Sequence, residues 1–69
     1  MIEVAPLYVN ELTRSEALLY CAFLEYNGHK DWRLPTYLEY VELDELGCWH
    51  IDRTDKFKWY VKPVRDIDE

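Results

Sequence analysis

Three side chains in the second half of the chain are of types that do chemistry. Cys48, His50 and Asp52 alternate along a segment whose composition is typical of a β-strand, so they would share one face of that strand. An imidazole between a thiol and a carboxylate suits general-base catalysis or metal binding. A tetrahedral metal site needs ligands that converge from several directions, which one strand does not provide. We therefore expect no metal site here, and we expect His50 to be a surface or hydrogen-bonded histidine.

Outside this segment, the sequence offers His29, which lies close to Asp31, and a second cysteine, Cys21. We interpret His29 in the same way as His50. Two cysteines are too few for the disulfide framework of a small secreted domain, and their spacing matches neither a zinc motif nor a redox Cys-x-x-Cys. Reduced thiols in the core are the simpler interpretation. We accordingly expect neither catalytic residues nor a cofactor.

The 69 residues carry a net charge of −6 that is distributed unevenly. Nine acidic and three basic residues lie in 1–47, two acidic and five basic residues in 48–65, and three acidic residues in 66–69. The net charge disfavours binding to nucleic acid or to an anionic membrane. The chain lacks the pattern of a secretory leader, and no apolar run approaches the roughly 20 residues that span a bilayer. We expect a cytoplasmic protein.

The length predicts one compact domain over residues 1–65, followed by a frayed acidic tail over 66–69. Residues 2–4 and 7–9 have the composition of short extended segments. A first helix is expected to begin after Thr13, because Thr13 and Glu16 form a capping-box pattern. We expect it to run to Tyr26 or Asn27 and to end at Gly28.

A second capping-box pattern, formed by Thr36 and Glu39, predicts a second helix that ends before Gly47. Residues 48–51 and 56–62 then have the composition of strands, separated by a polar turn at 52–55. Phe57, Trp59 and Val61 alternate with polar neighbours, which predicts a hairpin with these three on its buried face. The expected fold is α+β, with two helices packed on a small antiparallel sheet in the order β-α-α-β-β.

The first helix carries more apolar residues than one core-facing stripe requires. The core stripe, at spacings of three and four residues, consists of Ala17, Tyr20, Cys21 and Leu24. Leu19, Phe23 and Tyr26 form a second stripe on another side of the helix. An apolar face of this kind needs a cover. Either the strands of the domain wrap around both sides, or the face binds a second copy or a protein partner.

Three segments carry a resemblance to known domains. They read Ala17-x-x-Tyr20-Cys21-x-x-Leu24, then Gly28-x-x-Asp31-Trp32-Arg33-Leu34-Pro35-Thr36-x-x-Glu39, then Tyr60-Val61-Lys62-Pro63-Val64-Arg65-Asp66. The chain thereby resembles bacterial Lcl C-terminal-like domains and the related formylglycine-generating, sulfatase-modifying domains, which share the C-type-lectin-like fold. The resemblance implies that the N- and C-terminal strands pair. It also implies that Trp32 and Leu34 are core residues, that Arg33 pairs with carbonyl groups or an acid, and that Pro35 and Thr36 start the second helix.

The chain departs from these families in size. Their long loop region between the second helix and the final strands, where ligands and catalytic residues usually lie, is reduced here to about residues 48–56. The copper-binding cysteine pair of the formylglycine-generating enzymes cannot be transferred to Cys21 and Cys48. The Glu-Pro-Asn and Trp-Asn-Asp motifs of calcium-dependent lectins do not occur in the sequence.

These observations predict a small, non-catalytic protein-binding module, of the kind a phage or an accessory regulatory system encodes. The residues expected to contact a partner are Leu19, Phe23, Tyr26, Trp49, His50 and Trp59. One alternative is an acidic inhibitor of a nucleic-acid-binding enzyme, acting through the acids of the second helix: Glu39, Glu42, Asp44 and Glu45. Another is a degenerate relative of a sulfatase-modifying enzyme that uses Cys48 and His50.

Overall fold

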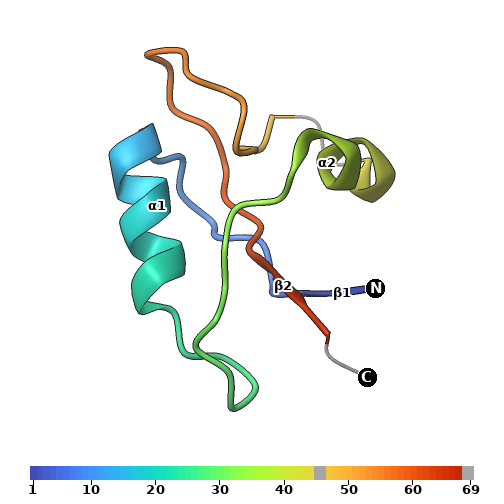
Figure 1. Ribbon diagram of the computed structural model, residues 1–69. Helices are drawn as coiled ribbons and strands as arrows, with labels where there is room; N and C mark the ends of the chain where they lie inside the picture. Colours follow the sequence, from blue (N-terminus) through green and yellow to red (C-terminus); the bar gives the residue numbers. More distant parts are fainter. Residues whose placement is uncertain (45–46, 68–69) are drawn as a thin grey trace.

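The computed structural model describes residues 1–44 and 47–67, in which two short strands and two helices alternate with long irregular segments (Figure 1). In chain order the elements are β1 (Ile2–Val4), α1 (Arg14–Phe23), α2 (Tyr37–Leu43) and β2 (Val64–Asp66). The two helices lie on opposite sides of the segments that cross the middle of the molecule. The expected α+β fold with an antiparallel sheet is confirmed in this general form.

Both helices begin where the capping boxes predict. The Thr13 side chain accepts a hydrogen bond from the Glu16 amide at 3.3 Å, and the Glu16 carboxylate accepts one from the Thr13 amide at 2.9 Å. Thr36 and Glu39 make the same two bonds at 3.3 and 2.8 Å. Each reciprocal pair satisfies two amide groups that the first turn of a helix leaves without partners.

The first helix ends earlier than predicted. Leu24, directly after α1, is already extended, so the prediction that the helix reaches Tyr26 or Asn27 was wrong. Asn27 and Gly28 both have positive φ, and Tyr26 and His29 exchange two backbone hydrogen bonds around them at 3.1 and 3.0 Å. Positive φ at both central residues is the signature of a tight Asn-Gly hairpin turn. Gly28 thus serves this turn and does not cap α1.

The second helix ends at Leu43, and Asp44 caps it in the left-handed conformation with φ 53°. Short polar residues tolerate this conformation better than most. The prediction placed the end of this helix before Gly47. Residues 45 and 46, including the acid Glu45, lie outside the described part of the chain.

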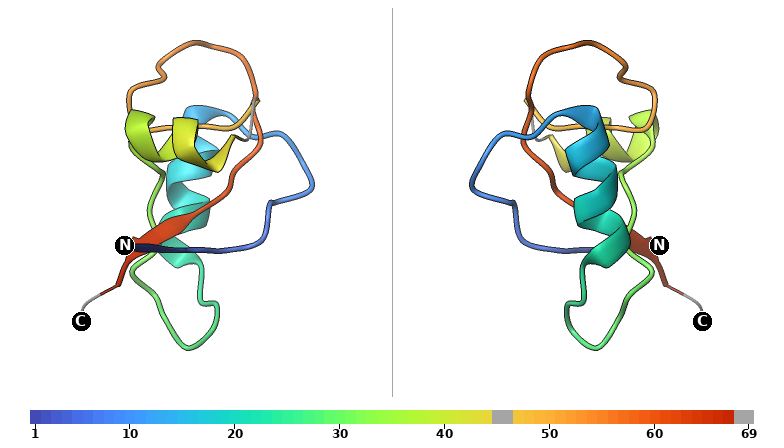
Figure 2. Two further views of the ribbon diagram at one scale, coloured as in Figure 1. Left: turned by 90° about the vertical axis from the view of Figure 1, so that its right-hand side faces the viewer. Right: turned by 90° about the vertical axis from the view of Figure 1, so that its left-hand side faces the viewer.

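The two ends of the domain pair with each other, as the resemblance implied. β1 and β2 are antiparallel, with Ile2 opposite Asp66 and Val4 opposite Val64. Figure 2 shows β1 and β2 side by side. Asp66 therefore belongs to a strand and not to a frayed tail, whereas residues 68 and 69 lie outside the described residues.

The hairpin predicted for residues 48–62 is absent from the described structure, so the observed order is β-α-α-β. Cys48 instead forms an isolated parallel bridge with Tyr60, and Trp59 pairs in antiparallel fashion with Leu12. Parallel pairing cannot be closed by a tight turn, so residues 51–58 form a wide loop. Phe57, which was expected on the buried face, is 70% exposed in this loop.

The core lies between α1 and the crossing segments. Its buried members are Ala17, Cys21, Leu34, Trp49 and Val61. The Trp49 side chain is completely buried, and its indole nitrogen donates to the Leu12 carbonyl at 2.7 Å, which satisfies its one polar group. Burial raises the pKa of the Cys21 thiol to about 12, so this cysteine stays protonated and unreactive.

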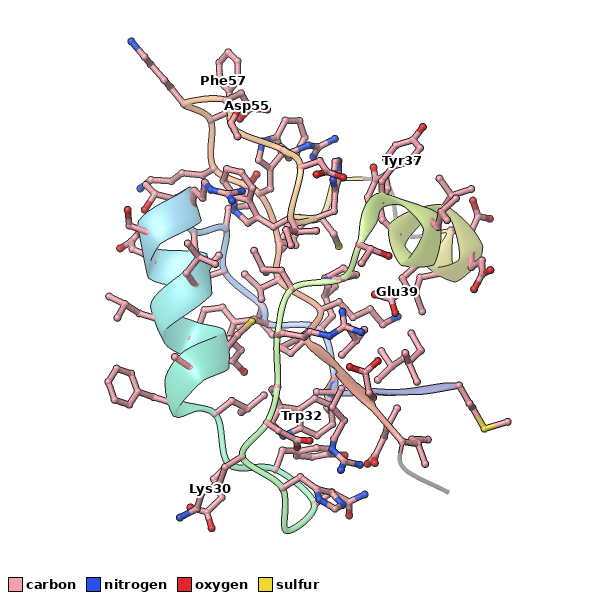
Figure 3. All side chains as sticks on the ribbon, viewed as in Figure 1. Lys30, Trp32, Tyr37, Glu39, Asp55 and Phe57 are labelled. Carbon is pink, nitrogen blue, oxygen red and sulfur yellow. The ribbon has the colours of Figure 1, made fainter. Side chains whose placement is uncertain are left out.

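Arg33 connects three parts of the fold (Figure 3 labels its partner Glu39). Its guanidinium makes a two-point contact with Glu39 of α2 at 2.8 and 3.0 Å and reaches Asp66 of β2 at 2.9 Å. It also donates to the Leu34 carbonyl at 3.1 Å. Hydrogen bonds from Arg33 lower the pKa of Glu39 to about 2, so the pair is ionised throughout the physiological range. The expectation that Arg33 pairs with a carbonyl and an acid is confirmed.

Replacing Arg33 with lysine is expected to lower the free energy of unfolding by about 1–3 kcal/mol, since an ammonium group cannot hold Glu39 at two points and reach Asp66 at once. Solvent screening of this half-buried group moves the value toward the lower end. Urea unfolding followed by tryptophan fluorescence measures it. Lys30→Ala, which removes an exposed pair with Glu25 at 3.8 Å, is the control and should change stability by less than about 0.5 kcal/mol. Equal losses in the two variants would contradict the role assigned to Arg33.

Candidate functional site

The side of α1 that faces away from the core carries exposed apolar side chains. Ala17 and Cys21 face the core, while Leu19 and Phe23 face solvent, with Phe23 81% exposed. The right-hand view of Figure 2 shows α1 in front of the rest of the chain, so no other described element covers this side. The alternative in which the strands wrap around both sides of α1 is therefore not what the structure shows.

A shallow hollow of about 460 Å³ lies along this face. Leu19, Tyr20 and Phe23 contribute to it from α1, and Leu24 contributes from the residue that follows the helix. Leu12 forms another part of the wall and is held there by two backbone hydrogen bonds with Trp59 at 2.9 and 3.0 Å. These four α1-side residues and Leu12 make the wall apolar, and the backbone of Trp59, far away in the sequence, holds Leu12 in position.

Two acidic residues, Glu16 and Glu25, also line the hollow. Hydrogen bonds from Thr13 lower the pKa of Glu16, which keeps this carboxylate negative at neutral pH. Glu25 is exposed and has one surface cation, Lys30, at 3.8 Å. Such exposed pairs contribute little free energy, so a competing cation can replace Lys30 easily. The hollow therefore combines an apolar floor with acidic residues.

Tyr26 does not belong to this face, although it was predicted to extend the stripe of Leu19 and Phe23. Because α1 ends at Phe23, Tyr26 leaves the helical register and packs against Trp32, with ring centroids 5.8 Å apart. The face is shorter than a continuous helix would make it. Leu12 and Leu24 line the hollow instead of Tyr26. Helical spacing could not have indicated Leu12, because Leu12 precedes the helix.

Two residues of the second predicted contact group, which consists of Trp49, His50 and Trp59, are buried in the structure. Trp49 is completely buried and His50 is 8% exposed, so the prediction that they meet a partner was wrong for the folded monomer. Trp59 is half-buried, with the Arg53 guanidinium 3.9 Å from its ring centre and its indole nitrogen bonded to Asp55 at 2.7 Å. Trp49 and His50 are buried because their segment does not form a hairpin: it pairs in parallel with Tyr60 through Cys48, and this brings Trp49 into the core.

His50 lies in an aromatic enclosure. The rings of Tyr40 and Tyr37 lie 4.7 and 5.4 Å from its centre, and Figure 3 shows Tyr37 at the beginning of α2. Its Nδ1 atom is buried with no hydrogen-bond partner among the described residues. Burial, and then the positive charge of Arg53, lower the pKa of His50. The imidazole is therefore neutral at physiological pH and shielded from solvent.

The described residues form neither the metal site considered for Cys48, His50 and Asp52 nor a continuous acidic surface on α2. Within residues 1–44 and 47–67, no three His, Cys, Asp or Glu side chains are grouped so that they could hold a metal ion. The acids of α2 form no uninterrupted array either, since Glu39 is paired with Arg33. In the same part of the chain, no helix has the length and apolar character needed to cross a membrane.

Comparison of the chain with protein-family models, with curated proteins and with solved structures gave no match. The geometry of the α1 hollow and the charges around it are therefore the basis for a functional proposal.

The enclosure of His50 predicts that the domain loses stability on mild acidification. The folded pKa lies below the ordinary value of 6.5, so the unfolded chain takes up the extra proton and stability falls as the pH drops below that value. We expect the melting temperature to decrease between about pH 7.5 and about pH 5.5, above the range where carboxylates such as Glu39 titrate.

His50→Gln should remove most of this decrease, whereas His29→Gln, at a site 40% exposed, should retain it. Differential scanning calorimetry of the three proteins at both pH values measures the effect. A decrease of the same size in the His50 variant would show that another group causes it.

Proposed function

We propose that this protein is a non-catalytic binding module that receives an apolar side chain of a protein partner in the α1 hollow. The observation that carries the proposal is the exposure of Phe23 beside Leu19 on the wall of that hollow. Full burial of one such side chain is worth about 1.5–3 kcal/mol. A few aromatic and aliphatic anchors of this kind supply most of the affinity in protein interfaces.

The acidic residues of the hollow support a partner whose anchor is flanked by basic residues. Glu16 and Glu25 contribute negative charge next to the apolar wall, on a chain whose net charge is −6. Charge complementarity of this kind speeds association and selects between partners more than it adds affinity. It also disfavours nucleic acid as the ligand of this face.

We propose further that the domain is a minimal relative of the C-type-lectin-like fold. Pairing of β1 with β2 and burial of Trp32 and Leu34 support this relationship. Less supports the alternatives. Of the acids considered for an inhibitor, Glu39 is already paired with Arg33, and Glu45 lies outside the described residues. A relative of a sulfatase-modifying enzyme would need an accessible cysteine, whereas Cys21 and Cys48 are both buried.

Phe23→Ser is expected to weaken partner binding at least about tenfold, which corresponds to about 1.4 kcal/mol, while the domain remains folded because Phe23 contributes little to its core. The wild-type chain would be used to capture partners from the source cells. The purified partner would then be titrated with each variant by isothermal titration calorimetry.

Leu38→Ser on α2 is the matched control, since Leu38 is also an exposed apolar helix residue but does not line the hollow. Its affinity should equal that of the wild type. Equal binding by the Phe23 variant would locate the partner elsewhere and overturn the proposal.

A further inference from the structure

The loop of residues 51–58 presents a second apolar anchor at its tip. Phe57 is 70% exposed and lies between two exposed lysines, Lys56 and Lys58. Figure 3 shows Phe57 at one end of the molecule, directed away from both helices. An exposed aromatic side chain flanked by two cations is unusual on a chain that is otherwise strongly acidic.

We call residues 56–58 the Phe57 tip, and hydrogen bonds to Asp55 hold its backbone in place. One carboxylate oxygen of Asp55 accepts hydrogen bonds from the Phe57 amide at 3.0 Å and from the Trp59 indole at 2.7 Å. The Arg53 guanidinium packs over the Trp59 ring and completes the base of the loop. Holding the backbone of the tip in one conformation reduces the entropy lost on binding.

The tip and the α1 hollow are complementary. The hollow is apolar and is flanked by acids, and the tip is an apolar ring flanked by bases. Glu16 already experiences the positive charge of Lys58 in its own chain. Among the described residues, the ion pair of Glu25 is the exposed contact with Lys30 at 3.8 Å, so Glu25 is the acid of the hollow that remains for Lys56 of another copy. No residue of 51–58 lines the hollow, so the tip does not fill it within one chain.

We propose that the Phe57 tip of one copy of this chain docks in the α1 hollow of a second copy. This inference rests on the proposed function and names the partner. In Figure 3, Phe57 lies at the opposite end of the molecule from Lys30, the neighbour of Glu25, so the Glu25 end of the hollow is remote from the tip of its own chain and open to the tip of another copy. A symmetric contact between two α1 faces would bring the acids of both hollows together and would be repulsive.

Head-to-tail contacts leave one free tip and one free hollow, so they build rings or open chains and not a closed pair. One aromatic anchor buries much less than the roughly 1,200 Å² at the lower limit of stable interfaces. The association is therefore weak. It increases with protein concentration and decreases as salt screens the contacts of the lysines with the acids.

Two single variants test the proposal together. Phe57→Ser removes the tip and Phe23→Ser damages the hollow, and both change exposed residues, so folding is retained. Each variant alone should sediment as a monomer at concentrations where the wild type and Leu38→Ser associate. An equal mixture should form dimers and nothing larger, because one intact hollow and one intact tip remain in each pair. Sedimentation velocity measures all of these states.

Wild-type protein that stays monomeric at millimolar concentration, variants that still associate alone, or a mixture that stays monomeric would each overturn the inference. These results are separable from a failure of the proposed function. A monomeric wild type whose capture of another protein is lost in Phe23→Ser would leave the binding function intact and exclude only self-association. Loss of both would remove both proposals.

Discussion

The crossing of Arg33 over β2 is the interaction on which the arrangement of this small domain depends. Its backbone exchanges two hydrogen bonds with Val64, both at 2.8 Å, and its side chain holds Glu39 and Asp66. Residues from the middle and the end of the chain are thereby fixed at one point. A domain of this size buries only roughly 60% of its unfolded surface. A few contacts that join several elements consequently matter more than they would in a larger protein.

The crossing separates the two helices and so decides which surfaces are left uncovered. Residues 31–35 pass between α1 and α2 in Figure 1, and the core between the crossing segments and α1 includes Leu34 and Trp49. Only one side of α1 is needed to cover this core, so Leu19 and Phe23 remain outside. The exposed apolar face arises because the described elements do not enclose α1, and the proposed binding function rests on this face.

The wide loop of residues 51–58 has a similar origin. The bridges of Cys48 to Tyr60 and of Leu12 to Trp59 use the backbone groups that a hairpin would have used. Residues 51–58 must then form a wider connection than a hairpin turn, and the hydrogen bond from the Phe57 amide to Asp55 shapes a turn within it. One end of the molecule thus carries a basic aromatic tip, while acids lie beside the hollow on α1.

Local sequence determined the features that depend on residues a few positions apart. The capping boxes at Thr13 and Thr36 could be predicted because their hydrogen bonds join residues three apart, and the surplus of apolar residues on α1 follows from composition. The Asn27-Gly28 turn also had a local signal, which the expectation of a longer helix overlooked. Only the tertiary structure decided the pairing of residues 48–62, the burial of Trp49 and His50, and the contribution of Leu12 to the hollow. Alternating apolar and polar residues show that a segment can form a strand, but they do not determine which strand it pairs with. That pairing depends on contacts between residues far apart in the chain.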